Sequence, residues 1–139
     1  MSPEVLQSSV DIDDQPKVVS SEGGFFIIGY GSKTLELMID LRGEHGGRGK
    51  ARTKIDAVDG KSRRLGETTA LYQFALSVMR EIGSDHRMPI RYVFSTSNPT
   101  MKAWALHPEK GMGVFDWDWV KNGRKKFEAH KVILPESLG

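Results

Sequence analysis

The chain has 139 residues, 27% of them charged and 38% hydrophobic, and a formal net charge of +2. That length suits one domain able to bury a core without disulfides or metals, and so small a net charge does not by itself indicate a nucleic-acid-binding protein. The lack of cysteine excludes both a disulfide framework and a thiolate nucleophile. No apolar run is long enough to span a bilayer, and acids occupy the N-terminus where a secretion signal needs positive charge, so we expect a cytoplasmic protein with no membrane partner.

The first part of the chain shows a polar arm followed by three strand patterns. Residues 1–22 are rich in serine and acidic residues and lack sustained periodicity, which predicts a flexible N-terminal arm before a single domain over 23–139. An apolar run covers 24–30, and apolar and polar residues alternate over 34–42 and again over 51–58. These patterns are typical of β-strands, and the alternation indicates one buried face.

A strongly amphipathic segment comes next. Its apolar residues recur at helical spacing and predict a helix from about Glu67 to Ile82, with Gly83 placed to end it in a left-handed cap. The β-branched and aromatic residues over 90–95 then predict a buried strand.

A second, shorter helix is predicted from its boundary residues. Asn98 is a favourable N-cap, and Pro99 suits the first helical turn because its missing N–H has no intrahelical partner there. Pro108 ends this helix near Leu106.

The remaining residues predict a hairpin. Two strand-like runs, 114–120 and 126–134, flank Asn122-Gly123, a dipeptide that suits a two-residue type I′ turn. Three aromatic residues alternate along the first run and are interpreted as core: Phe115, Trp117 and Trp119.

A basic, glycine-containing loop joins the third strand to the long helix. A helix start leaves backbone N–H groups unpaired and carries the positive end of the macrodipole, so this loop predicts an anion-binding site. The spacing Arg63-x-x-Gly66-x-Thr68 resembles the pyrophosphate loop of the GCN5-related N-acetyltransferases, which reads Arg or Gln, two residues, Gly, one residue, and Gly or Ala. Thr68 departs from that pattern. The resemblance implies that coenzyme A contacts Val58, Arg63, Arg64, Leu65, Gly66, Glu67, Thr68 and Asn98.

The order of the predicted elements over 23–134 is also similar to that family's order. The resemblance implies an acetyltransferase-like α+β fold with a mainly antiparallel central sheet, one long helix and one short helix, lacking the usual N-terminal strand and helices. It further implies an enzyme that transfers an acetyl group from acetyl-CoA, as cosubstrate, to an amine on a small molecule or a protein. Because the missing N-terminal elements normally form part of the acceptor wall, we hypothesise that a homodimer supplies it.

Catalytic groups are less clearly indicated than the anion site. Asp56, on the polar side of the third strand, is a candidate general base, although pairing with Arg52 or Lys54 accounts for it equally simply. The family commonly has a tyrosine seven or eight residues after the asparagine, and this chain has none there. His107 is the nearest candidate proton donor, with capping of the short helix as its simpler role. The histidines are scattered, so no metal site is expected.

Two other functions remain open. One is a non-catalytic nucleic-acid or protein-binding module on the same scaffold, supported by basic clusters that would bind phosphates if they share a face. Against it, the aromatic residues are spaced as core and are not interleaved with the basic residues. The other is an acyl-CoA sensor, supported by the expected lack of the N-terminal elements and by the absent tyrosine. The basic clusters are Arg48, Lys50, Arg52 and Lys54; Lys61, Arg63 and Arg64; and Lys121, Arg124, Lys125 and Lys126.

Overall fold

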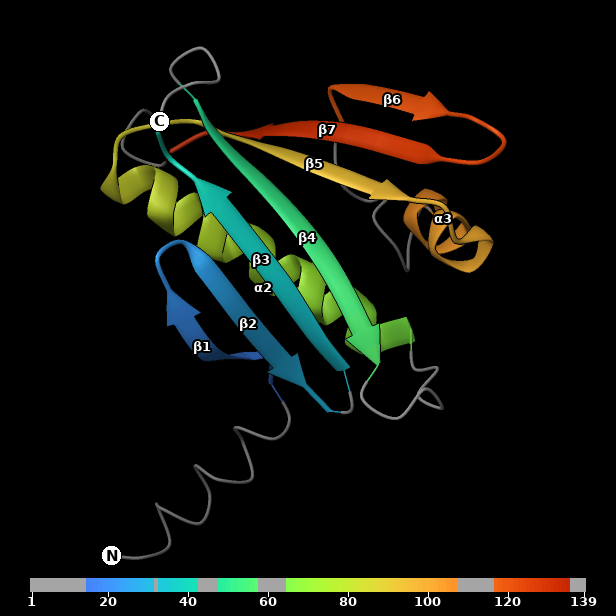
Figure 1. Ribbon diagram of the computed structural model, residues 1–139, viewed down its shortest axis with the longest axis horizontal. Helices are drawn as coiled ribbons and strands as arrows, with labels where there is room; N and C mark the ends of the chain where they lie inside the picture. Colours follow the sequence, from blue (N-terminus) through green and yellow to red (C-terminus); the bar gives the residue numbers. More distant parts are fainter. Residues whose placement is uncertain (1–14, 32, 43–47, 58–64, 108–116, 136–139) are drawn as a thin grey trace, which may run out of the picture.

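In the part of the chain that the structure describes, seven strands form one sheet, and two helices accompany it (Figure 1). This is a computed structural model, and it describes residues 15–31, 33–42, 48–57, 65–107 and 117–135. The strands are β1 Lys17–Glu22, β2 Phe25–Tyr30, β3 Lys33–Asp40, β4 Gly49–Ala57, β5 Ile90–Thr96, β6 Trp119–Asn122 and β7 Phe127–Ile133. The helices are α2, Leu65–Asp85, and α3, Pro99–Leu106. The predicted α+β class with a long and a short helix is confirmed.

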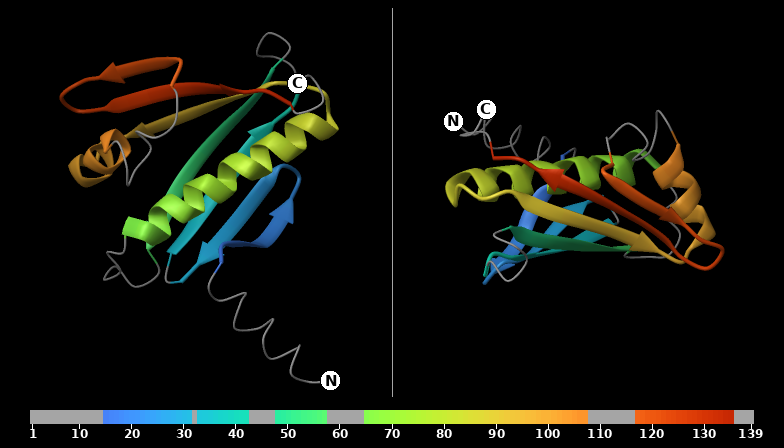
Figure 2. Two further views of the ribbon diagram at one scale, coloured as in Figure 1. Left: turned by 180° about the vertical axis from the view of Figure 1, so that it is seen from behind. Right: turned by 90° about the horizontal axis from the view of Figure 1, so that it is seen from above.

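The sheet is mainly antiparallel, as predicted. Its strand order is β1-β2-β3-β4-β5-β7-β6, and each neighbouring pair is antiparallel except β4 with β5. Two parallel strands require a long crossover connection. The helix α2, which follows β4 and precedes β5 in the chain, provides it by running back along the sheet. Figure 2 shows α2 lying across one face of the sheet.

The core lies between this face of the sheet and α2. Leu35, Leu37 and Ile39 on β3 are buried, and Leu41 packs against them half-buried, as the alternation predicts. Strand residues on the same face and apolar residues of α2 complete the core, which includes Ile28, Ala51, Leu71, Tyr72, Ala75, Leu76, Met79, Ile90, Tyr92, Phe94, Phe127, Ala129 and Ile133. Burial of this apolar surface is the main force that holds the helix on the sheet.

The edge strand β1 lies within the flexible arm predicted over 1–22 and corrects that prediction for 17–22, whereas residues 1–14 lie outside the described residues. Lys17–Glu22 pairs with β2 through a turn at Gly23 and Gly24, both with positive φ. A Cβ at Gly24 would lie 2.5 Å from the Ile39 carbonyl oxygen, so glycine is required there. All six residues of β1 are exposed, so the strand has no apolar periodicity to reveal it. The expected absence of an N-terminal strand is therefore wrong, whereas no helix separates β1 from β2.

The end of α2 also differs from the prediction. The helix continues through Gly83 to Asp85, and the left-handed residue is Arg87, with φ 52°. The Met88 N–H donates to the Gly83 carbonyl and the Arg87 N–H to the Ser84 carbonyl, which together form a Schellman cap. A Cβ at Gly83 would lie 2.8 Å from the Met88 carbonyl oxygen. Glycine is thus needed for close approach of the returning chain and not for positive φ.

The boundaries of α3 are those predicted. Asn98 is the N-cap, and its side-chain oxygen accepts hydrogen bonds from the Thr100 and Met101 N–H groups. Trp104 anchors the helix, because its ring packs against Tyr72 and Phe94 and its Nε1 donates to Thr69 Oγ1 at 3.0 Å.

The hairpin forms, but with a different turn and register. Asn122 pairs with Phe127, so residues 123–126 make the connection and the predicted two-residue type I′ turn is wrong. The Gly123 N–H donates to the Lys126 carbonyl. Trp117 packs against the core as predicted, but Trp119 is 44% exposed on the opposite face because β6 pairs it with His130. Phe115 lies outside the described residues.

Candidate functional site

The strands β4 and β5 pair only over their first four rungs. The last pair joins Arg52 to Val93, yet β4 continues to Ala57 and β5 to Thr96. Figure 1 shows the two strands diverging beyond that point. Among the described residues, backbone groups on that edge of β4 after Arg52 therefore receive no partner from β5, which makes this edge a candidate for pairing with an extended ligand.

Two hydroxyl groups join the strands where they separate. Thr53 Oγ1 lies 2.6 Å from the hydroxyl of Tyr92, and both residues face α2. Burial raises the pKa of Tyr92 well above its usual value near 10, and the neighbouring Tyr72 raises it further, while the Thr53 hydroxyl lowers it only in part. Burial likewise raises the pKa of Tyr72. Both phenols therefore stay protonated at neutral pH and act as hydrogen-bonding groups, not as bases.

The predicted pyrophosphate loop is only partly described. Val58, Arg63 and Arg64 lie outside the described residues, whereas Leu65, Gly66 and Glu67 form the first turn of α2. The helix thus begins inside the motif, and this places backbone N–H groups of its first turn at the end of the loop that follows β4.

Thr68 is buried and accepts a hydrogen bond from Lys33. The distance from Lys33 Nζ to Thr68 Oγ1 is 2.8 Å, and Lys33 is only 7% exposed. The positive end of the helix macrodipole lies at the start of α2, so an anion is favoured at this end of the helix. The sequence reasoning missed Lys33, although its spacing from Leu35 and Leu37 indicates the buried face.

The other predicted site residues are placed unequally. Asp56 lies on the part of β4 beyond its pairing with β5, and its backbone pairs with Thr34, but its side chain lies outside the described residues. His107 is exposed at the C-cap of α3, where its backbone N–H donates to Trp104, in agreement with the capping role. Asn98 uses its side-chain oxygen for the cap and lines a hollow of about 100 Å³ beside the β6–β7 connection.

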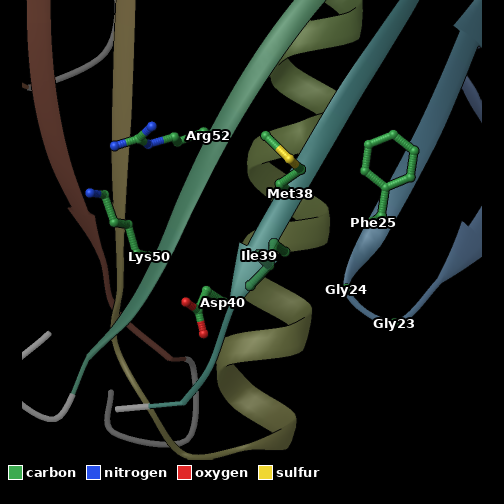
Figure 3. Close-up of a pocket in the computed structure, with 8 residues that line it drawn as sticks. All are labelled: Gly23, Gly24, Phe25, Met38, Ile39, Asp40, Lys50 and Arg52. Carbon is green, nitrogen blue, oxygen red and sulfur yellow. The ribbon is translucent and has the colours of Figure 1, made fainter. Parts of the chain in front are cut away.

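A second feature is the sheet face opposite α2. It carries a shallow depression of about 430 Å³, and Figure 3 shows the residues that line it. Phe25 and Met38 give it an apolar side, while Lys50, Arg52 and Asp40 bring charge to it. Met38 is 48% exposed, which is unusual for a large apolar side chain in the middle of a sheet.

The described residues contain no group of three or more histidines, acids or cysteines positioned to hold a metal ion. Among these residues, neither helix has the length and apolar character required to cross a bilayer. Comparison of the chain with protein-family models, with curated proteins and with solved structures finds no match.

Proposed function

We propose that the chain binds an acyl-coenzyme A and transfers its acyl group, most simply acetyl, to an amine. The observation that carries this proposal is the edge of β4 beyond Arg52, which β5 leaves unpaired and which leads into the basic loop and the start of α2. In the acetyltransferase family that the sequence resembles, this edge hydrogen-bonds the pantetheine arm and the loop holds the pyrophosphate. The mainly antiparallel sheet with one long and one short helix accords with what the same resemblance implies.

The start of α2 supplies the electrostatic part of the proposal. Backbone N–H groups at Leu65–Glu67 favour an anion there, and arginines of the preceding loop would add charge-assisted donors. The departure of Thr68 from the family pattern has a structural counterpart, because its hydroxyl is already bonded to Lys33. A threonine in that position therefore serves to hold the buried lysine.

In the proposed reaction an amine nitrogen attacks the thioester carbonyl carbon, the carbon–sulfur bond breaks, and the thiolate leaves with the acyl group now on nitrogen. One proton must leave the amine and one must reach the thiolate. Asp56 is the proposed base, because it lies on the part of β4 that extends beyond the pairing with β5. The fully described α3 has no tyrosine, so His107 or solvent supplies the second proton.

A calorimetric titration with acetyl-CoA tests the binding step. The wild-type chain is compared with Arg63→Ala, Gly66→Glu and with a control of equal charge change on the exposed part of α2, Arg80→Ala, Gln73→Glu. Saturable binding that only the loop variant loses supports the site. No binding by the wild-type chain, or equal loss in both variants, overturns it.

Turnover separates the enzyme from an acyl-CoA sensor. Release of free thiol on addition of candidate amines identifies a transferase, whereas tight binding without thiol release over a broad amine panel identifies the sensor. Sedimentation velocity on the active species tests the proposed homodimer, and a fully active monomer would contradict it.

A further inference from the structure

Among the described residues, no helix covers the sheet face opposite α2. In Figure 2, α2 lies entirely on the other side of the sheet, and α3 packs at the end of β5 through Trp104. We call the uncovered side the open face. Along its central strands it is composed of Lys50, Arg52 and Lys54 on β4 and Arg91, Val93 and Ser95 on β5.

Positive charge is concentrated on these two strands. Lys50, Arg52 and Lys54 alternate along β4 and form no ion pair within the described part of the chain. Lys50 also lies directly opposite Arg91, and like charges facing one another across strands are destabilising. Two acids of β3 face this cluster, because Asp40 lies directly opposite Lys50 and Glu36 directly opposite Lys54. Neither lysine forms an ion pair with its partner in the described part of the chain, and the Asp40 carboxylate is held by Arg42 at 2.8 and 3.0 Å. An anionic ligand would offset the repulsion.

A single cross-strand row links this charge to two aromatic residues. In register across six strands the row is Phe25, Met38, Arg52, Val93, His130 and Trp119. It spans five strand spacings, or about 24 Å. Arg52 lies near its middle, and an aromatic ring lies at each end.

The Trp119 end of the row is held in place by its neighbours. The ring centroid of Trp119 lies 4.5 Å from that of His130, yet 44% of Trp119 remains exposed. Arg91 donates to His130 Nδ1 at 2.6 Å, and because a guanidinium cannot accept, the imidazole proton is on Nε2. Nε2 lies 3.5 Å from Glu128 Oε1 but makes no hydrogen bond within the described part of the chain, so the Arg91 contact is what orients the imidazole. The indole is therefore presented on a supported side chain, which lowers the entropy lost when a ring stacks on it.

We infer that the open face binds single-stranded nucleic acid, laid across the strands along this row. Phosphates would contact the β4 cations and Arg91, and unpaired bases would stack on Trp119 and Phe25. A duplex fits less well, because exposed rings on a sheet stack only on bases that are unstacked from their partners. This placement also revises the sequence-based objection that aromatic and basic residues are separate, since pairing with β7 turns Trp119 to the basic face.

Fluorescence anisotropy with a labelled oligothymidylate of about 20 nucleotides tests this inference, a length that exceeds the row. Saturable binding at about 50 mM salt is expected, with log K falling against log salt by roughly 0.7 per phosphate contact. The variant Lys50→Gln, Arg52→Gln, Lys54→Gln should lower the slope by about 2 and reduce affinity at least tenfold. Trp119→Ala should reduce affinity roughly tenfold with little change in slope.

A matched control removes the same charge elsewhere: Arg80→Gln, Arg87→Gln, Lys125→Gln, all exposed and located on α2, just after it, and in the β6–β7 connection. Circular dichroism confirms that each variant is folded. The inference is overturned if the wild-type chain does not bind, if the control loses as much affinity as the β4 variant, or if a duplex of equal length binds as tightly. Equal displacement by polyglutamate would identify an acidic protein as the partner instead and would also overturn it.

Discussion

The hydroxyl pair at the point where β4 and β5 separate allows an exacting test of the structure. Thr53 Oγ1 and the Tyr92 hydroxyl are 2.6 Å apart, and Tyr92 is fully buried whereas Thr53 is half-buried. Thr53→Val preserves the side-chain shape but leaves the buried phenol of Tyr92 without its hydrogen-bond partner, which lowers the free energy of unfolding by about 2 kcal/mol. Tyr92→Phe removes this partner from the half-buried Thr53 hydroxyl, which keeps its interaction with Tyr72, and costs about 1 kcal/mol. With both hydroxyl groups removed, the loss is again about 1 kcal/mol.

A double-mutant cycle measured by urea unfolding therefore gives a coupling free energy of about 2 kcal/mol, with the double variant more stable than the sum of its parts. In a thermal scan this corresponds to roughly 6 °C, at about 3 °C per kcal/mol for a chain of this size. Additive losses, or a Tyr92→Phe variant less stable than Thr53→Val, would refute the hydrogen bond as the link between the strands. The same variants titrated with acetyl-CoA show whether that link also shapes the proposed binding edge.

Three further predictions concern stability. Burial raises the pKa of both Tyr72 and Tyr92 above the value in the unfolded chain, so the free energy of unfolding falls as pH rises above about 10. The expected loss is up to about 1.4 kcal/mol per pH unit for each phenol. Urea unfolding of a Tyr72→Phe, Tyr92→Phe variant over this pH range should show a flatter dependence. Arg87→Gly relieves the backbone strain of a left-handed non-glycine residue and raises the free energy of unfolding by about 1 kcal/mol, whereas Arg87→Ala gives no such gain. Equal free energies of unfolding for the two variants would contradict the cap geometry. Asn98→Ala removes the cap of α3 and costs about 1 kcal/mol, while Asn98→Asp retains most of it; an unchanged urea midpoint for Asn98→Ala would show that the cap contributes nothing.

Periodic signals in the sequence predicted most of the fold because they reflect burial on one face. The alternation over 34–42 and the apolar stripe of α2 specify which side chains meet in the core, and both are found there. The N-cap at Asn98 is equally local, because the capping oxygen and the N–H groups it accepts from are two and three residues apart. Such features depend on neighbouring residues and need no knowledge of the rest of the chain.

The features that the sequence did not reveal depend on contacts between distant segments. β1 is stabilised by hydrogen bonds to β2, and its exposed side chains leave no periodic trace. Gly83 reads as a cap until the return of Met88 over the helix end is known. Likewise, the side on which Trp119 lies follows from pairing with His130, which the Asn122-Gly123 dipeptide did not predict. Lys33 is buried against Thr68, 35 residues away in the chain.

Both proposals converge on β4, and the alternation of a strand keeps them independent. The proposed coenzyme A site uses the backbone edge of β4 after Arg52 and the start of α2. The open face instead uses the outward side chains of Lys50, Arg52 and Lys54. Glutamine at those positions removes charge without removing any backbone donor or acceptor. A variant of the loop at Arg63 and Gly66 leaves the open face unchanged. If the glutamine variant loses nucleic-acid binding but keeps acetyl-CoA binding, and the loop variant loses acetyl-CoA binding but keeps nucleic-acid binding, each ligand is assigned to its own surface of β4. If each variant loses both ligands, a single basic site accounts for the two.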